Sequence, residues 1–272
     1  MWKLFKQSLT TPLATGAYPT TPEPAGKEFR GQPKIDLERC TGCLACAKTC
    51  PTGALTGDNL GLELDLAKCI FCGVCQEKCS AGAVGLSQEF ELAGKHRADF
   101  KQTFCFGEKP VGPDQDMDYL GHCLEKKIKR LFGRSLHIRH LDTGSCNGCD
   151  WEINCLLNPV HDIQRFGFDF VASPRHADVL FCTGPVTAHL EQAVKRTYAA
   201  VPSPKLVAAV GTCACSGGIY KDGYAVLGGV DKVLPVDIFI PGCPPRPQAI
   251  IYGLMVALDK LEQKIARSTF TK

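Results

Sequence analysis

The second half of this 272-residue chain alternates short apolar runs with segments whose apolar residues recur at helical spacing. Short apolar runs set between helices are typical of the buried strands of a parallel sheet. The predicted strands are residues 136–141, 168–172, 178–182, 205–210 and 236–240. The predicted helices are residues 154–167, 187–198 and 247–264, the first interrupted at Pro159. This order predicts an α/β fold with a parallel, doubly wound sheet.

The first half of the chain lacks this alternation. Residues 1–33 are rich in Thr, Pro and Gly, so we expect an extended arm that runs over a partner or stays mobile. Residues 34–85 are predicted to form a small α+β domain. Residues 86–134 are predicted to be a linker, in which a strand and an extended arm precede a helix over residues 118–132. The α/β domain would then occupy residues 135–266.

A duplicated cysteine pattern fills the small domain. Residues 40–55 and 69–84 each contain C-x2-C-x2-C-x3-C, the spacing of bacterial ferredoxins with two [4Fe-4S] clusters. In such ferredoxins the fourth cysteine of each run ligates the cluster held by the other run. Gly42 and Gly73 allow the backbone to wrap closely around the sulfides. The predicted ligands are Cys40, Cys43, Cys46 and Cys79 for one cluster, and Cys69, Cys72, Cys75 and Cys50 for the second.

Two zinc sites with four cysteines each are the alternative for these residues. That alternative would make the chain a zinc-stabilised interaction or scaffold protein. Such zinc sites are built from two C-x2-C pairs, whereas this chain has two runs of four cysteines in a duplicated frame. The pattern therefore favours a two-cluster ferredoxin domain.

The composition indicates the surroundings of these sites. Seventeen cysteines would suggest disulfides in a secreted chain, but residues 1–9 lack the apolar core and cleavage site of a signal peptide. We therefore expect metal-bound thiolates in a reducing compartment. The net charge is only +3, and no long Lys/Arg run indicates a nucleic-acid-binding face. The apolar runs are shorter than the roughly 20 residues of a membrane span, so we expect membrane association only through partners.

Three further cysteine-bearing segments follow predicted strands of the α/β domain. They carry Cys146 and Cys149 in GSCNGCDWE, Cys213 in GTCACSGG and Cys243 in PGCPP. Ligands of open α/β sheets bind beyond the carboxyl ends of the strands, so these four thiolates are expected to converge at one edge. Four cysteines flanked by glycines, without histidine, suit a third [4Fe-4S] cluster better than zinc. The alternative is that they are structural core cysteines.

Residues 135–265 resemble the small, cluster-bearing subunit of membrane-bound, complex-I-related [NiFe] hydrogenases, including those of formate hydrogenlyase, and the homologous 20-kDa-type subunit of complex I. The matching stretches are GSCNGCDWEI, SPRHADVLFCTGPV, GTCACSGGIY and PVDIFIPGCPPRPQAIIYG. Residues 34–84 resemble a ferredoxin subunit of the same complexes, fused here into one chain. The resemblance implies a flavodoxin-like fold that holds one [4Fe-4S] cluster on Cys146, Cys149, Cys213 and Cys243.

The resemblance also implies partners and a location. The partners would be a hydrogenase large subunit carrying the nickel–iron centre, other soluble and membrane subunits, and a ferredoxin or formate dehydrogenase-type redox partner. The chain would be cytoplasmic and peripheral on the inner face of the membrane through those subunits. Its predicted function is to relay electrons through three [4Fe-4S] clusters, as an oxidoreductase subunit without a catalytic centre of its own.

A quinone- or sulfur-reducing complex, in which the same cluster serves a different large subunit, is the alternative within electron transfer. Subunits of the complex I type carry the first two ligands as adjacent cysteines. Here Asn147 and Gly148 separate Cys146 from Cys149, as in hydrogenase small subunits. The spacing therefore favours a hydrogenase.

Residues beside the predicted ligands have two interpretations each. Glu152 matches an acidic position that the family places near the large-subunit centre, but it could equally be a helix N-terminal carboxylate. Arg175 and His176 could tune the cluster by hydrogen bonding or could form a surface turn before a strand. Cys215 could compete with Cys213, although GTC matches the family position and assigns Cys213. The other cysteines, namely Cys105, Cys123, Cys155 and Cys182, are predicted to be buried apolar residues.

Overall fold

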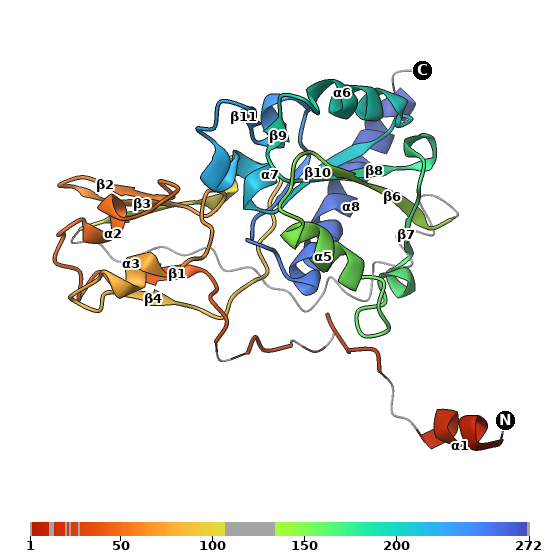
Figure 1. The fold of residues 1–272 in the computed structure, drawn as a ribbon, viewed down its shortest axis with the longest axis horizontal. Helices are drawn as coiled ribbons and strands as arrows, with labels where there is room; N and C mark the ends of the chain where they lie inside the picture. The colour runs from red at the N-terminus through yellow and green to blue at the C-terminus, as the bar shows by residue number, and fades with distance from the viewer. Residues whose placement is uncertain are drawn as a thin grey trace.

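The structure is a computed structural model that describes residues 2–10, 14–19, 21, 23–26, 28–106 and 134–270. It shows two halves side by side (Figure 1), here termed the ferredoxin-like half (residues 28–106) and the flavodoxin-like half (residues 134–270). The helix predicted over residues 118–132 and Cys123 lie outside the described residues. No helix in the described part of the chain is long and apolar enough to cross a membrane.

A five-stranded parallel sheet forms the centre of the flavodoxin-like half. Its strands are β6 (Leu136–Asp142), β7 (Phe168–Phe170), β8 (Val179–Thr183), β10 (Leu206–Val210) and β12 (Ile238–Ile240). They lie in the order β12-β10-β8-β6-β7, which is the flavodoxin order 2-1-3-4-5 read from the other edge. The predicted α/β fold with a flavodoxin-like sheet is therefore confirmed.

Both faces of this sheet are buried because successive strand residues point to opposite sides. On β8, Val179 and Phe181 pack into the core beneath α5 (Gly148–Cys155) and α8 (Pro247–Phe270). Leu180 and Cys182 pack into a second core, beside α6 (Glu191–Ala200) and α7 (Thr212–Ser216). The helices α5 and α6 accordingly lie on opposite sides of the sheet (Figure 1).

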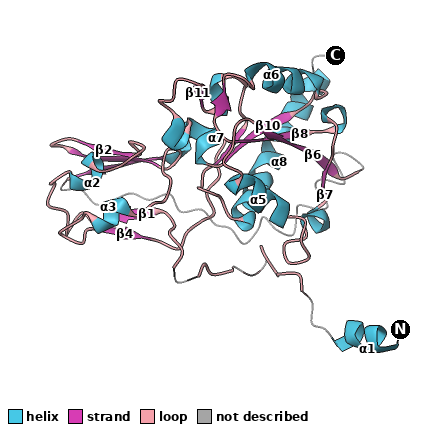
Figure 2. Cartoon of the chain, viewed as in Figure 1, coloured by secondary structure: helices cyan, strands magenta, loops and turns pink. Residues whose placement is uncertain are grey.

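The ferredoxin-like half consists largely of loops with small sheets (Figure 2). Strands β1 (Pro33–Ile35) and β4 (Val84–Leu86) form an antiparallel pair. Strands β2 (Leu55–Gly57), β3 (Gly61–Asp65) and β5 (Lys101–Cys105) form an antiparallel sheet. The short helices α2 (Ala45–Lys48) and α3 (Val74–Glu77) lie inside the two cysteine runs.

The second of these cores extends across both halves. Leu64 and Phe100 of the ferredoxin-like half pack in the same buried cluster as Leu180 and Phe239 of the flavodoxin-like half. Gly94 also forms a backbone bridge with Phe239 on the edge strand β12. Residues of the predicted linker therefore serve both halves: Gly94 joins the parallel sheet, and β5 extends the ferredoxin-like sheet.

Several predicted elements differ from the structure. The helix predicted over residues 154–167 is wrong, because the helix is α5, which begins at Gly148 after Asn147 adopts a left-handed conformation. Beyond α5, Pro159 lacks an N–H, and the Asn158 side chain accepts hydrogen bonds from Val160 N and His161 N, which stabilises a turn. Only a short 3-10 helix, η3 (Ile163–Phe166), follows.

The remaining differences are local. Helix α1 (Trp2–Thr10) lies within the predicted extended arm, in a stretch without Pro or Gly. The helix predicted to begin at Thr187 begins at Glu191, because β9 (Val186–Thr187) pairs with β11 (Val226–Gly228). Cys105, predicted to be buried, is exposed at the end of the edge strand β5. The other 3-10 segments of the described residues are η1 (Arg97–Phe100), η4 (Pro174–His176), η5 (Gly218–Tyr220) and η6 (Val230–Lys232).

Candidate iron–sulfur sites

Four cysteines lie beyond the carboxyl ends of the parallel strands, and we call them the third site. Cys146 and Cys149 follow β6, Cys213 follows β10 within α7, and Cys243 follows β12. Strands β6 and β8 flank the point at which the strand order reverses, where open α/β sheets bind ligands. The fold therefore brings together the four cysteines that are far apart in sequence.

The electrostatics of the third site show that its thiols are neighbours. Burial raises the pKa of Cys149, and the charges of Cys213, Cys243 and Cys146 raise it further. Burial also raises the pKa of Cys213 to about 11, with further contributions from Cys243 and Cys146. Thiolates held this close without a cation repel one another, so the site suits a positively charged group that keeps them deprotonated.

Glycines line the third site where a larger residue would touch sulfur. A Cβ at Gly211 or at Gly218 would lie closer than 3.0 Å to the Sγ of Cys149 or of Cys213, respectively. Gly211 has φ of 91°, a conformation that L side chains rarely adopt. The glycines therefore leave space around the two sulfurs, and any side chain would fill that space.

A polar network that was not predicted from the sequence fixes the first turn of α5. Asp150 Oδ1 lies 2.8 Å from His140 Nε2 and accepts a hydrogen bond of 2.6 Å from Thr183 Oγ1. Ser145 Oγ donates to the other oxygen of Asp150. The network ties the loop that carries Cys146 and Cys149 to strands β6 and β8. The sequence feature that could have indicated this network is Asp150, an acidic residue directly after Cys149 in the first turn of the helix.

The cysteines of the ferredoxin-like half separate into two groups. Cys40, Cys43, Cys46 and Cys79 line one cavity with Leu62 and Val84, and we call them the first ferredoxin site. Cys50, Cys69, Cys72 and Cys75 line another cavity with Leu55 and Leu64, and we call them the second ferredoxin site. In each group the fourth cysteine of one run joins three of the other, which is the crosswise arrangement that the spacing predicts.

Backbone groups in both ferredoxin sites are directed at sulfur. Phe71 N donates to Cys69 Sγ at 3.4 Å, and Ala83 N donates to Cys79 Sγ at 3.2 Å. Burial raises the pKa of Cys69 to about 12 and that of Cys75 to about 11. The exposed Cys43 differs, since a hydrogen bond from the Ala45 backbone lowers its pKa. N–H groups aimed at sulfur stabilise thiolates and the clusters that they hold.

The two cysteine runs share a backbone conformation. Gly42 and Leu44 in the first run have φ of 67° and 58°, and the equivalent Phe71 and Gly73 in the second run have φ of 55° and 81°. Each run therefore has one glycine at these two positions, but the glycine is at the first position in one run and at the second position in the other. At the remaining positions, Leu44 and Phe71 adopt the left-handed conformation that such residues rarely adopt. This indicates that the surroundings impose the shape of the loop.

The donor sets of the three sites bear on which metal group they suit. Within the described ranges, no group of three or more His, Cys, Asp or Glu side chains is placed to hold one metal ion. A zinc ion needs its thiolates about 2.3 Å from one centre, whereas a cluster of several irons holds them farther apart. Cysteine-only donor sets with glycine-lined space and N–H···S contacts fit [4Fe-4S] clusters. The individual ligand roles stay a prediction.

The other candidate residues have different surroundings. Glu152 is outside the first turn of α5, so the helix-start interpretation is wrong. It lines a cavity with Cys243 and Arg246, and burial raises its pKa while Arg246 opposes that shift. Arg175 and His176 are exposed in η4 before β8, at the sheet edge opposite to the cysteines. The surface-turn interpretation is therefore confirmed, and they do not reach the third site.

The spare cysteines are mainly core residues. Cys182 and Cys215 are completely buried, and Cys215 Sγ donates to Ala209 O at 3.5 Å. Cys155 is half-buried at the end of α5. Cys215 packs in the second core beside the sheet, while the charges of Cys243 and Cys146 raise the pKa of Cys213. The geometry therefore favours Cys213 as the member of the third site.

The fold and these cysteine groups define an iron–sulfur electron-transfer protein. Residues 146–257 match the family described as NADH ubiquinone oxidoreductase, 20 Kd subunit, and residues 32–80 match a 4Fe-4S dicluster domain. A probable membrane-bound hydrogenase subunit mbhJ of Pyrococcus furiosus is 47% identical over 145 residues, which are 52% of this chain and 87% of that protein. The chain belongs to the family of the 20-kDa subunit and carries a fused dicluster domain.

Other relatives match over part of their length. Formate hydrogenlyase subunit 7 of Escherichia coli is 46% identical over 57% of this chain and 60% of that protein. An NADH-quinone oxidoreductase subunit of Geobacter sp. is 53% identical over 37% of this chain and 59% of that protein. A chain in a solved structure of the membrane-bound sulfane sulfur reductase, an archaeal respiratory membrane complex, is 37% identical, with a TM-score of 0.43 over 48% of this chain and 72% of that chain. The family is thus represented in hydrogenases and in NADH-quinone oxidoreductases.

Proposed function

We propose that this chain is the electron-transfer subunit of a multisubunit [NiFe] hydrogenase. It would hold three [4Fe-4S] clusters, on the first ferredoxin site, the second ferredoxin site and the third site. The observation that carries the proposal is the convergence of Cys146, Cys149, Cys213 and Cys243 at one sheet edge, beside a dicluster domain in the same chain. Each cluster, when bound, accepts and releases one electron.

The chain's own residues would bind and orient these clusters and restrict access of water. The buried Cys149 and the half-buried Cys213 would anchor the third site from inside, while Cys146 and Cys243 lie at its exposed rim. The network of His140, Asp150 and Thr183 would hold the first ligand loop in place. These residues position a redox centre; the reaction with H2 belongs to a partner.

Exposed apolar side chains in and after α5 support a partner subunit. Trp151 is 73% exposed, and Leu157 and Val160, which follow it, are also exposed. Trp151 is two residues after Cys149, and a large exposed apolar side chain next to a redox site is a candidate contact for a partner. The partner would be the large subunit with the nickel–iron centre, and membrane subunits would hold the assembly at the membrane. The first ferredoxin site, with Cys43 at the surface, would face a ferredoxin or formate dehydrogenase-type partner.

The alternative is the cluster-bearing subunit of a quinone- or sulfur-reducing oxidoreductase. The similarity to a subunit of an NADH-quinone oxidoreductase supports this alternative. The separation of Cys146 from Cys149 by Asn147 and Gly148 favours the hydrogenase. Asn147 adopts φ of 65° and starts α5, so the two cysteines sit on a turn instead of on adjacent residues.

The test uses the intact complex, purified without oxygen. Nickel analysis, together with reduction of the clusters by H2 followed by EPR, should show nickel and clusters that H2 reduces. A nickel-free complex whose clusters are reduced by a quinol and not by H2 would favour the alternative.

A further inference from the structure

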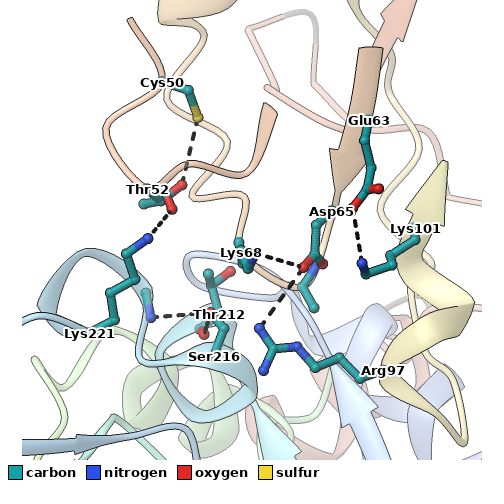
Figure 3. Close-up of polar contacts among 12 residues, drawn as sticks. Cys50, Thr52, Glu63, Asp65, Lys68, Arg97, Lys101, Thr212, Ser216 and Lys221 are labelled. Carbon is teal, nitrogen blue, oxygen red and sulfur yellow. Dashed lines mark hydrogen bonds and ion pairs between the residues drawn. The ribbon is translucent and has the colours of Figure 1, made fainter. Parts of the chain in front are cut away.

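The two halves of the chain are joined by hydrogen bonds at the ligand loops themselves. Thr212 Oγ1 donates to the main-chain oxygen of Cys69 at 2.7 Å. Lys221 Nζ donates to the main-chain oxygen of Thr52 at 2.9 Å (Figure 3). Cys69 belongs to the second ferredoxin site, and Thr52 is two residues after Cys50 of the same site. Both donors thus reach loops of one site from the flavodoxin-like half.

The Thr212 hydroxyl lies at the junction of three loops that carry cysteines. Thr212 precedes Cys213, is only 1% exposed and accepts a hydrogen bond of 3.3 Å from Gly242 N, next to Cys243. Gly242 O is 3.2 Å away, but a hydroxyl has one proton, and the 2.7 Å contact to Cys69 O is shorter. The hydroxyl can therefore donate to the second ferredoxin site while it accepts from the third site.

Lys221 provides a second connection of the same kind. It follows η5, the short helix a few residues after Cys213, and reaches the buried Thr52. The Thr52 hydroxyl lies 3.8 Å from Cys50 Sγ. An ammonium group on a buried carbonyl forms a charge-assisted hydrogen bond, which is stronger than a neutral one.

Arg97 adds an ionic bridge between the halves. It lies 3.9 Å from Asp65 in the ferredoxin-like half (Figure 3). It also lies 3.5 Å from Asp231 in the flavodoxin-like half. Asp65 is buried, lies 3.5 Å from Lys68 and accepts from Ala67 N, within the turn that leads to Cys69. The turn before Cys69 is thus connected to the flavodoxin-like half through Arg97, as Cys69 is through Thr212.

We propose that Thr212 and Lys221 are positioning residues that hold the second ferredoxin site against the third site. They keep the loops of the second ferredoxin site at the end of the sheet where the third site lies, and they add to the shared core that joins the two halves. The inference rests on the proposed function, because these cysteines are cluster ligands only there. The hydrogen bonds themselves are contacts within the chain, so they can be tested separately.

The test is hydrogen exchange of the full chain with its clusters, read by mass spectrometry. Thr212→Val should accelerate exchange across residues 66–73 by about fivefold, which corresponds to the roughly 1 kcal/mol of one hydrogen bond. Lys221→Met should do the same across residues 50–54. Thr212→Ser should restore the slow exchange, because it keeps the hydroxyl. Lys101→Met is the matched control, since Lys101 pairs with Glu63 inside the ferredoxin-like half.

A spectroscopic readout distinguishes positioning from general stability. Magnetic interaction between the reduced clusters should weaken in Thr212→Val and return in Thr212→Ser. Exchange in Thr212→Val and Lys221→Met that equals that of Lys101→Met would overturn the inference. If Thr212→Val does not fold, Lys221→Met decides the outcome, because Lys221 is half-buried and is not next to a cysteine. A shortage of iron in the unaltered chain would instead refute the proposed function.

Discussion

The two halves of this molecule build cysteine sites in opposite ways. In the ferredoxin-like half, each site takes its cysteines from two short runs, and the loop conformation repeats from run to run. In the flavodoxin-like half, one site takes its cysteines from the ends of three strands, and only the strand order brings them together. A local site depends on its turn, whereas the third site depends on the integrity of the whole sheet.

The largest expected effects come from truncating a buried residue in each half. Phe181 is completely buried at the centre of the parallel sheet, and Phe181→Ala should lower the free energy of unfolding by about 3–5 kcal/mol. Leu64, buried in the ferredoxin-like half, is the matched site, and Leu64→Ala should cost about 2–5 kcal/mol. Denaturation monitored by iron release should show that Phe181→Ala loses the iron of the third site first. Leu64→Ala should lose the iron of the ferredoxin sites first. Release of the same iron in both variants would contradict the comparison.

A glycine pair tests the space at the third site. Gly211→Ala places a Cβ against Cys149 Sγ and also strains a residue with φ of 91°. Gly82→Ala in the ferredoxin-like half meets no atom within 4 Å but has φ of 61°, so it should cost only the backbone strain of about 1–2 kcal/mol. Iron analysis should show loss from Gly211→Ala alone. Full iron content in Gly211→Ala would mean that iron binding at the third site does not require the space beside Cys149 Sγ.

An ion-pair comparison tests stability at positions away from the third site, and its exposed pair gives the smallest expected effect. Arg134 holds the nearly buried Asp178 with bonds of 2.8 and 2.9 Å at the amino end of the sheet, far from the cysteines. Arg134→Met should cost about 1.5–3 kcal/mol, as hydrogen bonds to charged groups do. Lys34→Met breaks an exposed pair with Glu89 and should cost less than about 1 kcal/mol. Both variants should keep their iron; loss of iron in Arg134→Met would show that the amino edge of the sheet also supports the third site.

The sequence predicted best what depends on local pattern or on strand periodicity. The duplicated cysteine run predicted the crosswise grouping, and apolar runs predicted every strand of the parallel sheet. The helix over residues 154–167 failed because the left-handed Asn147 starts α5 earlier and because the Asn158 side chain stabilises a turn at Pro159. Neither contact follows from periodicity, which reports burial and not side-chain capping.

Contacts between distant segments were not predictable. Arg175 and His176 are close in sequence to β8, but only the strand direction shows that they lie at the edge opposite to the cysteines. The contacts of Asp150 with His140 and of Thr212 with Cys69 join residues from separate elements. No spacing rule in the sequence predicts such pairs, because they depend on how the loops pack after the sheet has formed.

Iron stoichiometry tests the central claim, that the third site holds a cluster beside two ferredoxin clusters, most directly. The unaltered chain, prepared without oxygen, should contain about 12 irons, which is three clusters of four. Cys213→Ala should contain about 8 irons, and Cys215→Ala, which alters the buried neighbour, should keep about 12. About 8 irons in the unaltered chain, or an unchanged content in Cys213→Ala, would contradict the account.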